Sequence, residues 1–155
     1  MTKISVFQVG DEHDLSNLIK RVFDEFVAPD YSEAGNNFFH DFIVPENFID
    51  RVYSKDNIIL IAERNNLKVG MIEIRDYNHI SLLFVDKEFQ GEGIARELFT
   101  EALKICKLKD KSIVKIYVHA SPFSIPVYQK LGFQKTGDMQ EQFGIKYLPM
   151  ERVVD

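Results

Sequence analysis

The sequence has 155 residues, of which 45% are hydrophobic and 28% are charged, and its formal net charge is −5 at pH 7. These values are typical of a soluble globular protein, and the length suits a single domain spanning residues 1–155. The negative charge argues against nucleic acid as the main partner, because binding to phosphates requires clustered Lys and Arg side chains.

The first third of the chain is predicted to form a strand, a long helix and a second helical region. Residues 4–9 alternate loosely and are rich in β-forming types, which indicates a strand. Apolar residues at helical spacing predict a helix over about 12–26, and Asp11 is expected to cap it. The Phe-rich segment 31–51 predicts two short helices, because Pro45 interrupts the helical pattern.

The middle of the chain is predicted to form three strands and a helix. Two apolar runs, 57–63 and 68–75, flank a polar turn and indicate a hairpin. A third run, 79–85, predicts another strand. It leads through a turn with two glycines into an amphipathic helix predicted over 91–107.

The end of the chain is predicted to alternate strands and a short helix. Residues 112–119 alternate cleanly as a strand, and 124–131 fit a short helix that Gly132 would end. Segments 133–136 and 144–151 predict two closing strands. The order β-α-α-β-β-β-α-β-α-β-β combines hairpins with crossover helices. It predicts an α+β (mixed α/β) fold, with a mixed, mostly antiparallel sheet of about seven strands flanked by helices.

Cysteine usage and hydropathy indicate a cytoplasmic enzyme or binding module. The single cysteine, Cys106, excludes an internal disulfide and a Cys-based zinc cluster. No His, Cys or carboxylate spacing suggests a metal site. The first residues lack the long apolar core of a signal peptide, and no apolar run approaches membrane-spanning length. We therefore expect no metal and no membrane partner.

The turn between the strand 79–85 and the following helix is predicted to bind an anion. Free N–H groups in a first helical turn attract phosphate, and Gly91 and Gly93 would let a pyrophosphate approach the backbone. A Walker loop is excluded, because Ile94 and Ala95 follow Gly93 instead of Lys and Ser or Thr. A Rossmann fingerprint is excluded, because Ala95 comes one residue too early. An ordinary glycine-rich turn is the alternative.

Two motifs in this order resemble one known family. Gln90, Gly93 and Ala95 form the pattern Gln-x-x-Gly-x-Ala, which resembles the acetyl-CoA pyrophosphate loop of the GNAT N-acetyltransferase superfamily. Tyr128 and Gly132-Phe133 resemble the Tyr-x-x-x-Gly-Phe segment of the same family. The predicted order of elements is also the GNAT order, and the chain is identified as a member of that superfamily.

The resemblance implies acetyl-CoA as the co-substrate and assigns residues to it. Backbone groups of Leu83, Phe84 and Val85 would pair with the pantetheine arm, in a gap where this strand splays from the strand 112–119. The pyrophosphate would be held by backbone amides, those of Gln90, Gly91, Glu92, Gly93, Ile94, Ala95 and Arg96. The Arg96 side chain would add charge-assisted bonds to phosphate or lie in solvent. Ser121 or Ser124 would supply a hydroxyl where many members have Asn, or cap a helix.

The resemblance also implies catalytic roles. Tyr128 would donate a proton to the leaving thiolate as a general acid, or pack its ring against the sheet. Glu73 shares a strand face with Met71 and is the first candidate for the general base, with a solvent-facing glutamate as the alternative. His79, His119 or a water molecule are the other candidates for the base.

The acceptor is predicted to be an amine of a small molecule, or of a peptide or protein. Its site is expected in segments 31–51 and 138–144, which the family varies. Phe38, Phe39 and Phe42 would line a pocket or pack in the core. Acidic side chains around the first helix end would attract a cation or form a solvated surface; they are Asp24, Glu25, Asp30 and Glu33.

Other functions stay open at this point. A non-catalytic acetyl-CoA-binding sensor or assembly module would keep the same loop. The sequence also allows a different acyl donor or an oxygen acceptor, and the family suggests a homodimer.

Overall fold

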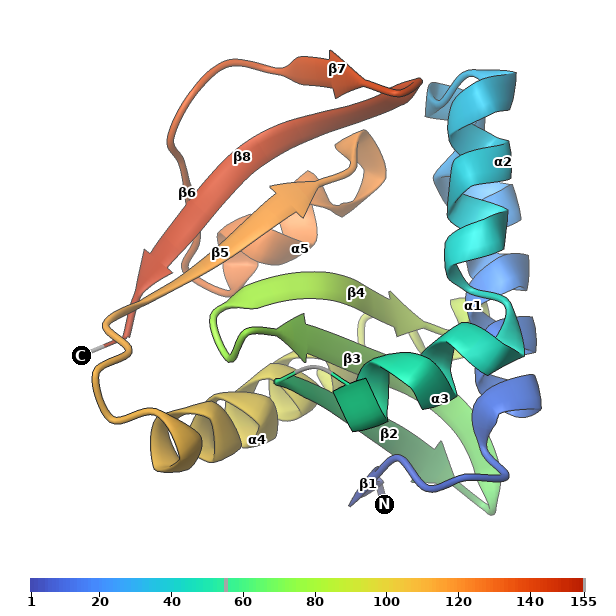
Figure 1. Cartoon of the computed structure of the whole chain (residues 1–155), viewed down its shortest axis with the longest axis vertical. Helices are drawn as coiled ribbons and strands as arrows, with labels where there is room; N and C mark the ends of the chain where they lie inside the picture. Colours follow the sequence, from blue (N-terminus) through green and yellow to red (C-terminus); the bar gives the residue numbers. More distant parts are fainter. Residues whose placement is uncertain (55, 155) are drawn as a thin grey trace.

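A single mixed sheet forms the centre of the computed structural model, which describes residues 1–54 and 56–154 (Figure 1). The described strands are β1 (Lys3–Val6), β2 (Asn57–Arg64), β3 (Leu67–Arg75), β4 (His79–Val85), β5 (Lys115–Ala120), β6 (Gln134–Lys135), β7 (Gln140–Gln142) and β8 (Ile145–Val153). Their order is β1-β2-β3-β4-β5-β8-β6, with β7 paired to β8. Only β4 and β5 pair in parallel among these strands. The mixed, mostly antiparallel sheet is therefore confirmed, with eight strands.

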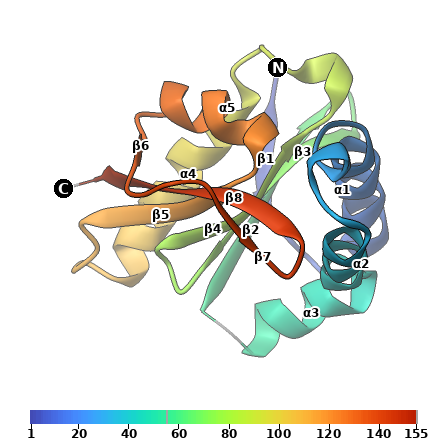
Figure 2. The same cartoon turned by 90° about the horizontal axis from the view of Figure 1, so that it is seen from above.

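Helices cover both faces of this sheet. They are α1 (Glu12–Phe26), α2 (Glu33–Phe42), α3 (Pro45–Ser54), α4 (Ile94–Lys109) and α5 (Ile125–Lys130), with short 3₁₀ turns η1 (Ala28–Asp30), η2 (Lys87–Phe89) and η3 (Pro122–Ser124). Seen from above, α1, α2 and α3 lie on one side of the sheet, and α4 and α5 lie on the other (Figure 2). The three-layer arrangement leaves the ends of β4 and β5 between the two helical layers.

The helices α1 and α3 begin where local features of the sequence predict. The helix predicted over 12–26 is α1, and its buried side chains are the apolar residues at helical spacing. Asp11 occupies the N-cap position of α1, as predicted, and its carbonyl accepts from the Leu15 N–H at 3.0 Å. Its carboxylate makes no cap bond to α1 and instead accepts from the backbone N–H of Gln8 at 2.9 Å. Pro45 begins α3, where its fixed φ and missing N–H are tolerated.

The central strands are buried on both faces, which explains their continuous apolar runs. Ile59, Ile61 and Met71 belong to the core cluster shared with α1, α2 and α3. Their sequence neighbours, such as Leu60 and Ile72, belong to the cluster shared with α4. This alternation follows from the two-residue period of a strand. It confirms that Met71 shares a face with Glu73.

Gly70 on β3 lets α4 pack closely on the sheet. A Cβ atom at Gly70 would lie 3.1 Å from Ile94 Cγ2 and 3.3 Å from Leu98 Cδ1. The first turn of α4 is therefore held beside the end of β4.

Strands β4 and β5 pair over only two positions and then separate. His79 pairs with Tyr117 and Ile80 with Val118, after which the ladder ends. A register shift between β3 and β4 leaves Ser81 as an extra residue at this point, and such bulges bend a strand. The splay that the family resemblance implied is confirmed.

The predictions missed one closing strand. Residues Gln140–Gln142 form β7, which pairs with the start of β8 through a tight turn at Phe143 and Gly144. Both turn residues have positive φ, 55° and 81°, the geometry of a two-residue hairpin turn. The strand is short and polar, so its sequence carries no apolar alternation to signal it.

Candidate active site

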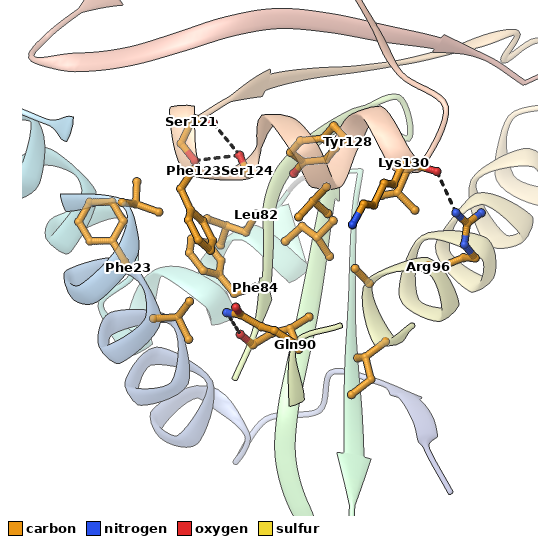
Figure 3. A pocket seen from close by; sticks show the side chains of 18 of the residues that line it. Phe23, Leu82, Phe84, Gln90, Arg96, Ser121, Phe123, Ser124, Tyr128 and Lys130 are labelled. Atoms are coloured by element: carbon orange, nitrogen blue, oxygen red, sulfur yellow. Dashed lines mark hydrogen bonds between the residues drawn. The ribbon is translucent and has the colours of Figure 1, made fainter. Parts of the chain in front are cut away.

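A cavity of about 350 Å³ occupies the space between the splayed strands (Figure 3). Its lining comes from α1, α2, β4, the turn after β4, the start of α4, the end of β5 and α5. The predicted cofactor residues that line it are Leu83, Phe84, Val85, Gln90, Gly91, Gly93, Ile94, Ala95, Arg96, Ser121 and Tyr128. Of the predicted set, Glu92 alone is outside this lining within the described residues. One cavity thus brings the two sequence motifs together.

The open edge of β4 forms one wall of this cavity. Leu83, Phe84 and Val85 pair with β3 on one side, whereas the ladder with β5 has already ended. Backbone N–H and C=O groups on that edge need partners, and an extended ligand can supply them as an added strand would. The Val85 carbonyl is partly used, because it accepts from Gln90 Nε2 at 3.1 Å.

The turn before α4 presents backbone donors at one end of the cavity. Gly91 and Gly93 have φ values of +83° and +86°, which glycine adopts without strain. The first backbone bond of α4 runs from the Glu97 N–H to the Gly93 carbonyl at 3.0 Å. The N–H groups between these two residues therefore point out of the helix start, where the helix dipole favours an anion. The helix was predicted to begin at residue 91, but α4 begins at Ile94, because the positive φ values of Gly91 and Gly93 do not fit a right-handed helix.

The backbone amide of Gln90 departs from the predicted role. It donates to the Lys87 carbonyl at 3.4 Å and closes η2. One N–H group of the predicted phosphate-binding set is therefore already paired within the chain.

Arginines from distant elements neutralise carboxylates that flank the turn. Arg21 on α1 holds Asp86, with Nη2 2.6 Å from Oδ2. Arg64 on β2 pairs with Glu92 and donates to Thr2 Oγ1 at 2.9 Å. An unpaired carboxylate here would repel phosphate. The two arginines therefore suit the turn to an anion, although the local sequence is acidic.

Positive side chains lie on the cavity wall near this turn. Arg96 and Lys130 both line the cavity, and Arg96 Nη2 donates to the Lys130 carbonyl at 2.8 Å (Figure 3). The bond fixes the guanidinium at the wall and leaves its other N–H groups for a ligand. Sequence reasoning did not single out Lys130, although it lies inside the Tyr128-to-Phe133 motif.

Tyr128 is buried at the wall of the cavity and keeps its proton. Its side chain is 4% exposed, and burial raises its pKa, with a further contribution from Tyr31. Burial and the nearby Asp30 raise the pKa of Tyr31 to about 12. Both phenols are therefore proton donors at neutral pH. Tyr31 precedes α2 and was not identified from the sequence, because no local motif marks it.

The two serines before α5 form a local pair. The Ser121 and Ser124 hydroxyls are 2.8 Å apart, and Ser124 Oγ donates to the Ser121 carbonyl at 3.0 Å. Both residues line the cavity. Neither side chain makes a cap bond to the helix it precedes, so the predicted capping role is wrong. A hydroxyl contact with the cofactor stays a prediction.

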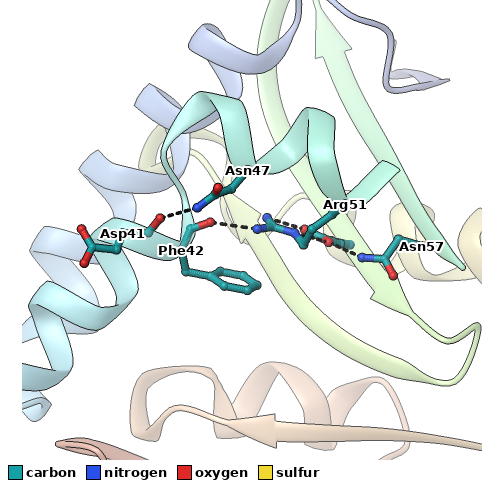
Figure 4. Close-up of polar contacts among 6 residues, drawn as sticks. Asp41, Phe42, Asn47, Arg51 and Asn57 are labelled. Atoms are coloured by element: carbon teal, nitrogen blue, oxygen red, sulfur yellow. Dashed lines mark hydrogen bonds and ion pairs between the residues drawn. The ribbon is translucent and has the colours of Figure 1, made fainter. Parts of the chain in front are cut away.

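Glu73 lies in a buried ion pair. Its carboxylate is 0% exposed and accepts from Arg51 Nε at 2.7 Å, Arg51 Nη2 at 3.0 Å and Asn57 Nδ2 at 2.6 Å. Arg51 reaches between Asn57 and Phe42, where it donates to the Phe42 carbonyl at 2.9 Å and lies 4.0 Å from the ring centroid (Figure 4). The solvent-facing alternative for Glu73 is wrong. The ion pair gives it a structural role that the sequence analysis did not anticipate.

The two candidate histidines differ in their access to the cavity. His119 lines the cavity, and the centroid of its ring is 4.3 Å from that of Tyr147 and 4.9 Å from that of His79. Burial and the Arg75 charge lower the pKa of His119. Burial, Arg75 and His119 lower the pKa of His79 to about 4. Both rings are therefore neutral at pH 7, but only His119 belongs to the cavity lining within residues 1–54 and 56–154.

Most of the other candidate residues lie outside the cavity lining. Phe39 lines the cavity, whereas Phe38 is 54% exposed and Phe42 packs under Arg51. Asp24 pairs with Lys20 and His40, and Glu25 pairs with Lys87. The acidic residues at the end of α1 are thus partly neutralised outside the cavity.

The described part of the chain holds no cluster of three or more His, Cys, Asp or Glu side chains suited to a metal ion. None of its helices has the length and apolar character needed to cross a membrane.

Comparison with known proteins gives a family match. A family model described as an acetyltransferase (GNAT) domain matches residues 27–154. The human "Cysteine-rich protein 2-binding protein" is 29% identical over 131 residues, which are 81% of this chain and 16% of that protein. An uncharacterized N-acetyltransferase of Methanocaldococcus jannaschii is 32% identical over 68 residues, which are 43% of this chain and 30% of that protein. The chain spans less than a third of the length of both relatives.

Solved structures share the whole fold. A GCN5-related N-acetyltransferase from Rhodopseudomonas palustris superimposes with a TM-score of 0.83 at 17% identity, covering 99% of this chain and 96% of that chain. The PaiA N-acetyltransferase from Thermoplasma acidophilum, solved in complex with coenzyme A, has a TM-score of 0.81 at 19% identity and covers 99% of each chain. At these identities the likeness is one of fold.

Proposed function

The chain belongs to the acetyltransferase (GNAT) family, and from this we propose that it transfers an acetyl group from acetyl-CoA to a primary amine, by direct attack in a ternary complex. One observation carries the proposal. The open edge of β4, the free amides that begin α4 and the protonated phenol of Tyr128 all face one cavity. These are the groups needed to hold an extended thioester, its diphosphate and its leaving group.

The residues of the turn fit a diphosphate. The outward N–H groups of the first turn of α4, the Arg96 side chain and the glycine backbone at Gly91 and Gly93 supply donors with no bulky side chain above them. Within 4 Å, a Cβ built at either glycine meets nothing, so the space above the turn is open. The pairs with Arg21 and Arg64 neutralise the carboxylates of Asp86 and Glu92, which would otherwise oppose an anion.

The reaction follows from placing the thioester beside β4. A strand N–H near Phe84 or Val85 polarises the thioester carbonyl. The amine nitrogen attacks the carbonyl carbon, and the C–S bond breaks with its electron pair leaving on sulfur. Tyr128 gives its proton to that sulfur, and His119 takes a proton from the attacking nitrogen. His119 is preferred as the base because Glu73 is held by Arg51 and lies outside the cavity lining.

A calorimetric titration with acetyl-CoA, followed by a thiol-release assay with a panel of amines, tests this function. We expect binding, together with release of free thiol that depends on the amine. Lack of acetyl-CoA binding at ordinary concentrations would reject the proposal. Binding without thiol release from any amine or alcohol would instead point to the non-catalytic sensor or assembly module.

A further inference from the structure

The end of the cavity that lies away from the turn is walled by aromatic rings, which we call the aromatic end. It consists of Phe23, Tyr31, Phe39, Phe84 and Phe123. Phe23 stacks on Phe39 with ring centroids 3.9 Å apart, and Tyr31 meets the edge of Phe23 at 5.5 Å. Phe39 lies 5.9 Å from Phe84. Figure 3 shows Phe23 and Phe123 on the side of the cavity opposite Arg96 and Lys130.

These rings come from separate segments of the chain and together form a mostly apolar wall. Phe23 is on α1, Tyr31 precedes α2, Phe39 is on α2, Phe84 is on β4 and Phe123 is in η3. Phe123 also stacks on Phe26 of α1, with centroids 4.7 Å apart, which joins the α1 side to the β5–α5 side. Such a wall favours flat apolar groups, which gain both burial and ring contacts.

The charges around the cavity disfavour a cationic ligand. Among the described residues, no Asp or Glu lines the cavity, and its charged side chains are Arg96 and Lys130. Asp24 and Glu25 are outside it and already pair with basic side chains. An ammonium group brought into this cavity would find no carboxylate partner, and burying an unpaired charge is costly. A polyamine or an aminoglycoside would bring several such groups.

We propose that the acceptor carries a single primary amine on a flat apolar body, of the arylalkylamine type, and that the aromatic end binds this body. The inference rests on the proposed function and names its substrate class. The amine would face the thioester near Tyr128, and one of its N–H protons would pass to the neutral ring of His119 on the cavity wall. The phenol of Tyr31 is the polar group of the aromatic end.

A competition of amines on the full chain tests the proposal. With saturating acetyl-CoA, thiol release is measured with 2-phenylethylamine, 1,4-diaminobutane and spermidine. We expect kcat/KM for 2-phenylethylamine to exceed that for either polyamine by about tenfold or more. The reason is that a single methylene bound in an apolar pocket already changes kcat/KM by about tenfold. Equal values, or a preference for the polyamines, would overturn the inference and leave the acetyltransferase function intact. If no amine in a broad panel released thiol, both the substrate class and the proposed acetyltransferase function would be overturned.

A long acyl chain is the competing occupant of the aromatic end. The same assay with octanoyl-CoA shows whether the aromatic end binds the acyl chain or the body of the amine. If octanoyl-CoA is used about tenfold better than acetyl-CoA with every amine, the rings hold the acyl chain and the inference is overturned. If acetyl-CoA is the better donor, the inference stands.

Two neighbouring phenylalanines of α2 provide a matched pair of variants. Phe39 lines the cavity, whereas Phe38 is 54% exposed and stacks on Phe143 outside it. Phe39→Ala should reduce the preference for 2-phenylethylamine over 1,4-diaminobutane about tenfold, and Phe38→Ala should leave it unchanged. Phe39→Leu keeps an apolar side chain and is a milder substitution. Binding of acetyl-CoA, measured by calorimetry, shows whether each variant is folded. A ratio unchanged in folded Phe39→Leu and Phe39→Ala would overturn the inference.

Discussion

The carboxylate of Glu73 accepts two hydrogen bonds from the guanidinium of Arg51, at 2.7 and 3.0 Å, in the layer between α3 and β3. Removing one partner of a buried pair leaves an uncompensated charge. We therefore expect Arg51→Met to lower the free energy of unfolding by about 3–5 kcal/mol, measured by urea denaturation. Lys20→Met, which breaks the exposed pair with Asp24, is the control and should cost less than about 1 kcal/mol. Equal losses in the two variants would contradict this view of the pair.

Glu73→Gln separates a structural role from a catalytic one. If Glu73 only balances Arg51, the variant should lose stability while kcat for the folded fraction changes less than about threefold. If it is the general base, kcat should fall by about 10²-fold or more at substrate saturation. Steady-state rates measured well below the melting temperature decide between the two. We expect the structural result, because the carboxylate lies outside the cavity lining within the described chain.

Tyr128→Phe removes a proton donor and keeps the ring. The pKa of this phenol is raised by burial and by Tyr31, so it is protonated throughout the neutral range. We expect kcat to fall by about 10²- to 10⁴-fold, while the acetyl-CoA dissociation constant stays within about twofold. Tyr53→Phe, at a phenol that is 75% exposed on α3, is the matched control. A full-rate Tyr128→Phe enzyme would remove the tyrosine from the mechanism.

The fold was predictable from the sequence wherever a pattern was local. The boundaries of α1 and β4 coincide with the expected 12–26 and 79–85, because α1 has apolar residues at helical spacing before Pro29 and β4 is an apolar run that ends at the polar turn beginning with Asp86. The strand β7 was missed, because its three polar residues pair with β8 only through a turn with positive φ. Pairing of that kind depends on the partner strand and leaves little trace in the segment itself.

The site was predictable where it follows a motif and unpredictable where it depends on tertiary contacts. The residues from Gln90 to Arg96 and Tyr128 belong to recurring patterns, and the fold brings them to one cavity, with Glu92 outside its lining. Tyr31 and Phe123 reach the same cavity from segments with no motif. The partner of Glu73 was equally hidden, since Glu73 is on the strand β3 and Arg51 lies 22 residues earlier on the helix α3. An alternating strand predicts which face a side chain takes, and not what packs against that face.

Arg64→Ala should weaken the affinity for acetyl-CoA through the turn. It leaves the Glu92 carboxylate without its guanidinium partner in the turn that we propose as the diphosphate site. We expect the acetyl-CoA dissociation constant, measured by calorimetry at low salt, to rise about fivefold, which corresponds to about 1 kcal/mol.

Two controls identify the origin of that effect. The KM for acetyl-pantetheine, which lacks the diphosphate, should not change in Arg64→Ala, and adding Glu92→Gln should restore the affinity for acetyl-CoA. An equal loss with both donors would mean that Arg64 supports the fold of the turn and not its charge balance.

His79 should make the protein less stable as the pH falls from 6.5 towards 4. Burial, Arg75 and His119 lower its pKa to about 4 in the folded chain, against about 6.5 when unfolded. Between these values the unfolded chain binds more protons, so stability rises with pH. The contribution of His79 to the free energy of unfolding is complete above about pH 6.5 and lost below about pH 4. Its maximum is about 3 kcal/mol.

His79→Gln isolates this contribution from that of the carboxyl groups. Urea unfolding at pH 7 and at pH 4 should show a decrease in the variant that is smaller than in the natural chain by about 2–3 kcal/mol. His13→Gln, on the exposed face of α1, controls for the loss of a histidine as such. If His79→Gln lost as much stability as the natural chain over this range, the acid sensitivity would come from other groups, because the substituted side chain cannot bind the proton.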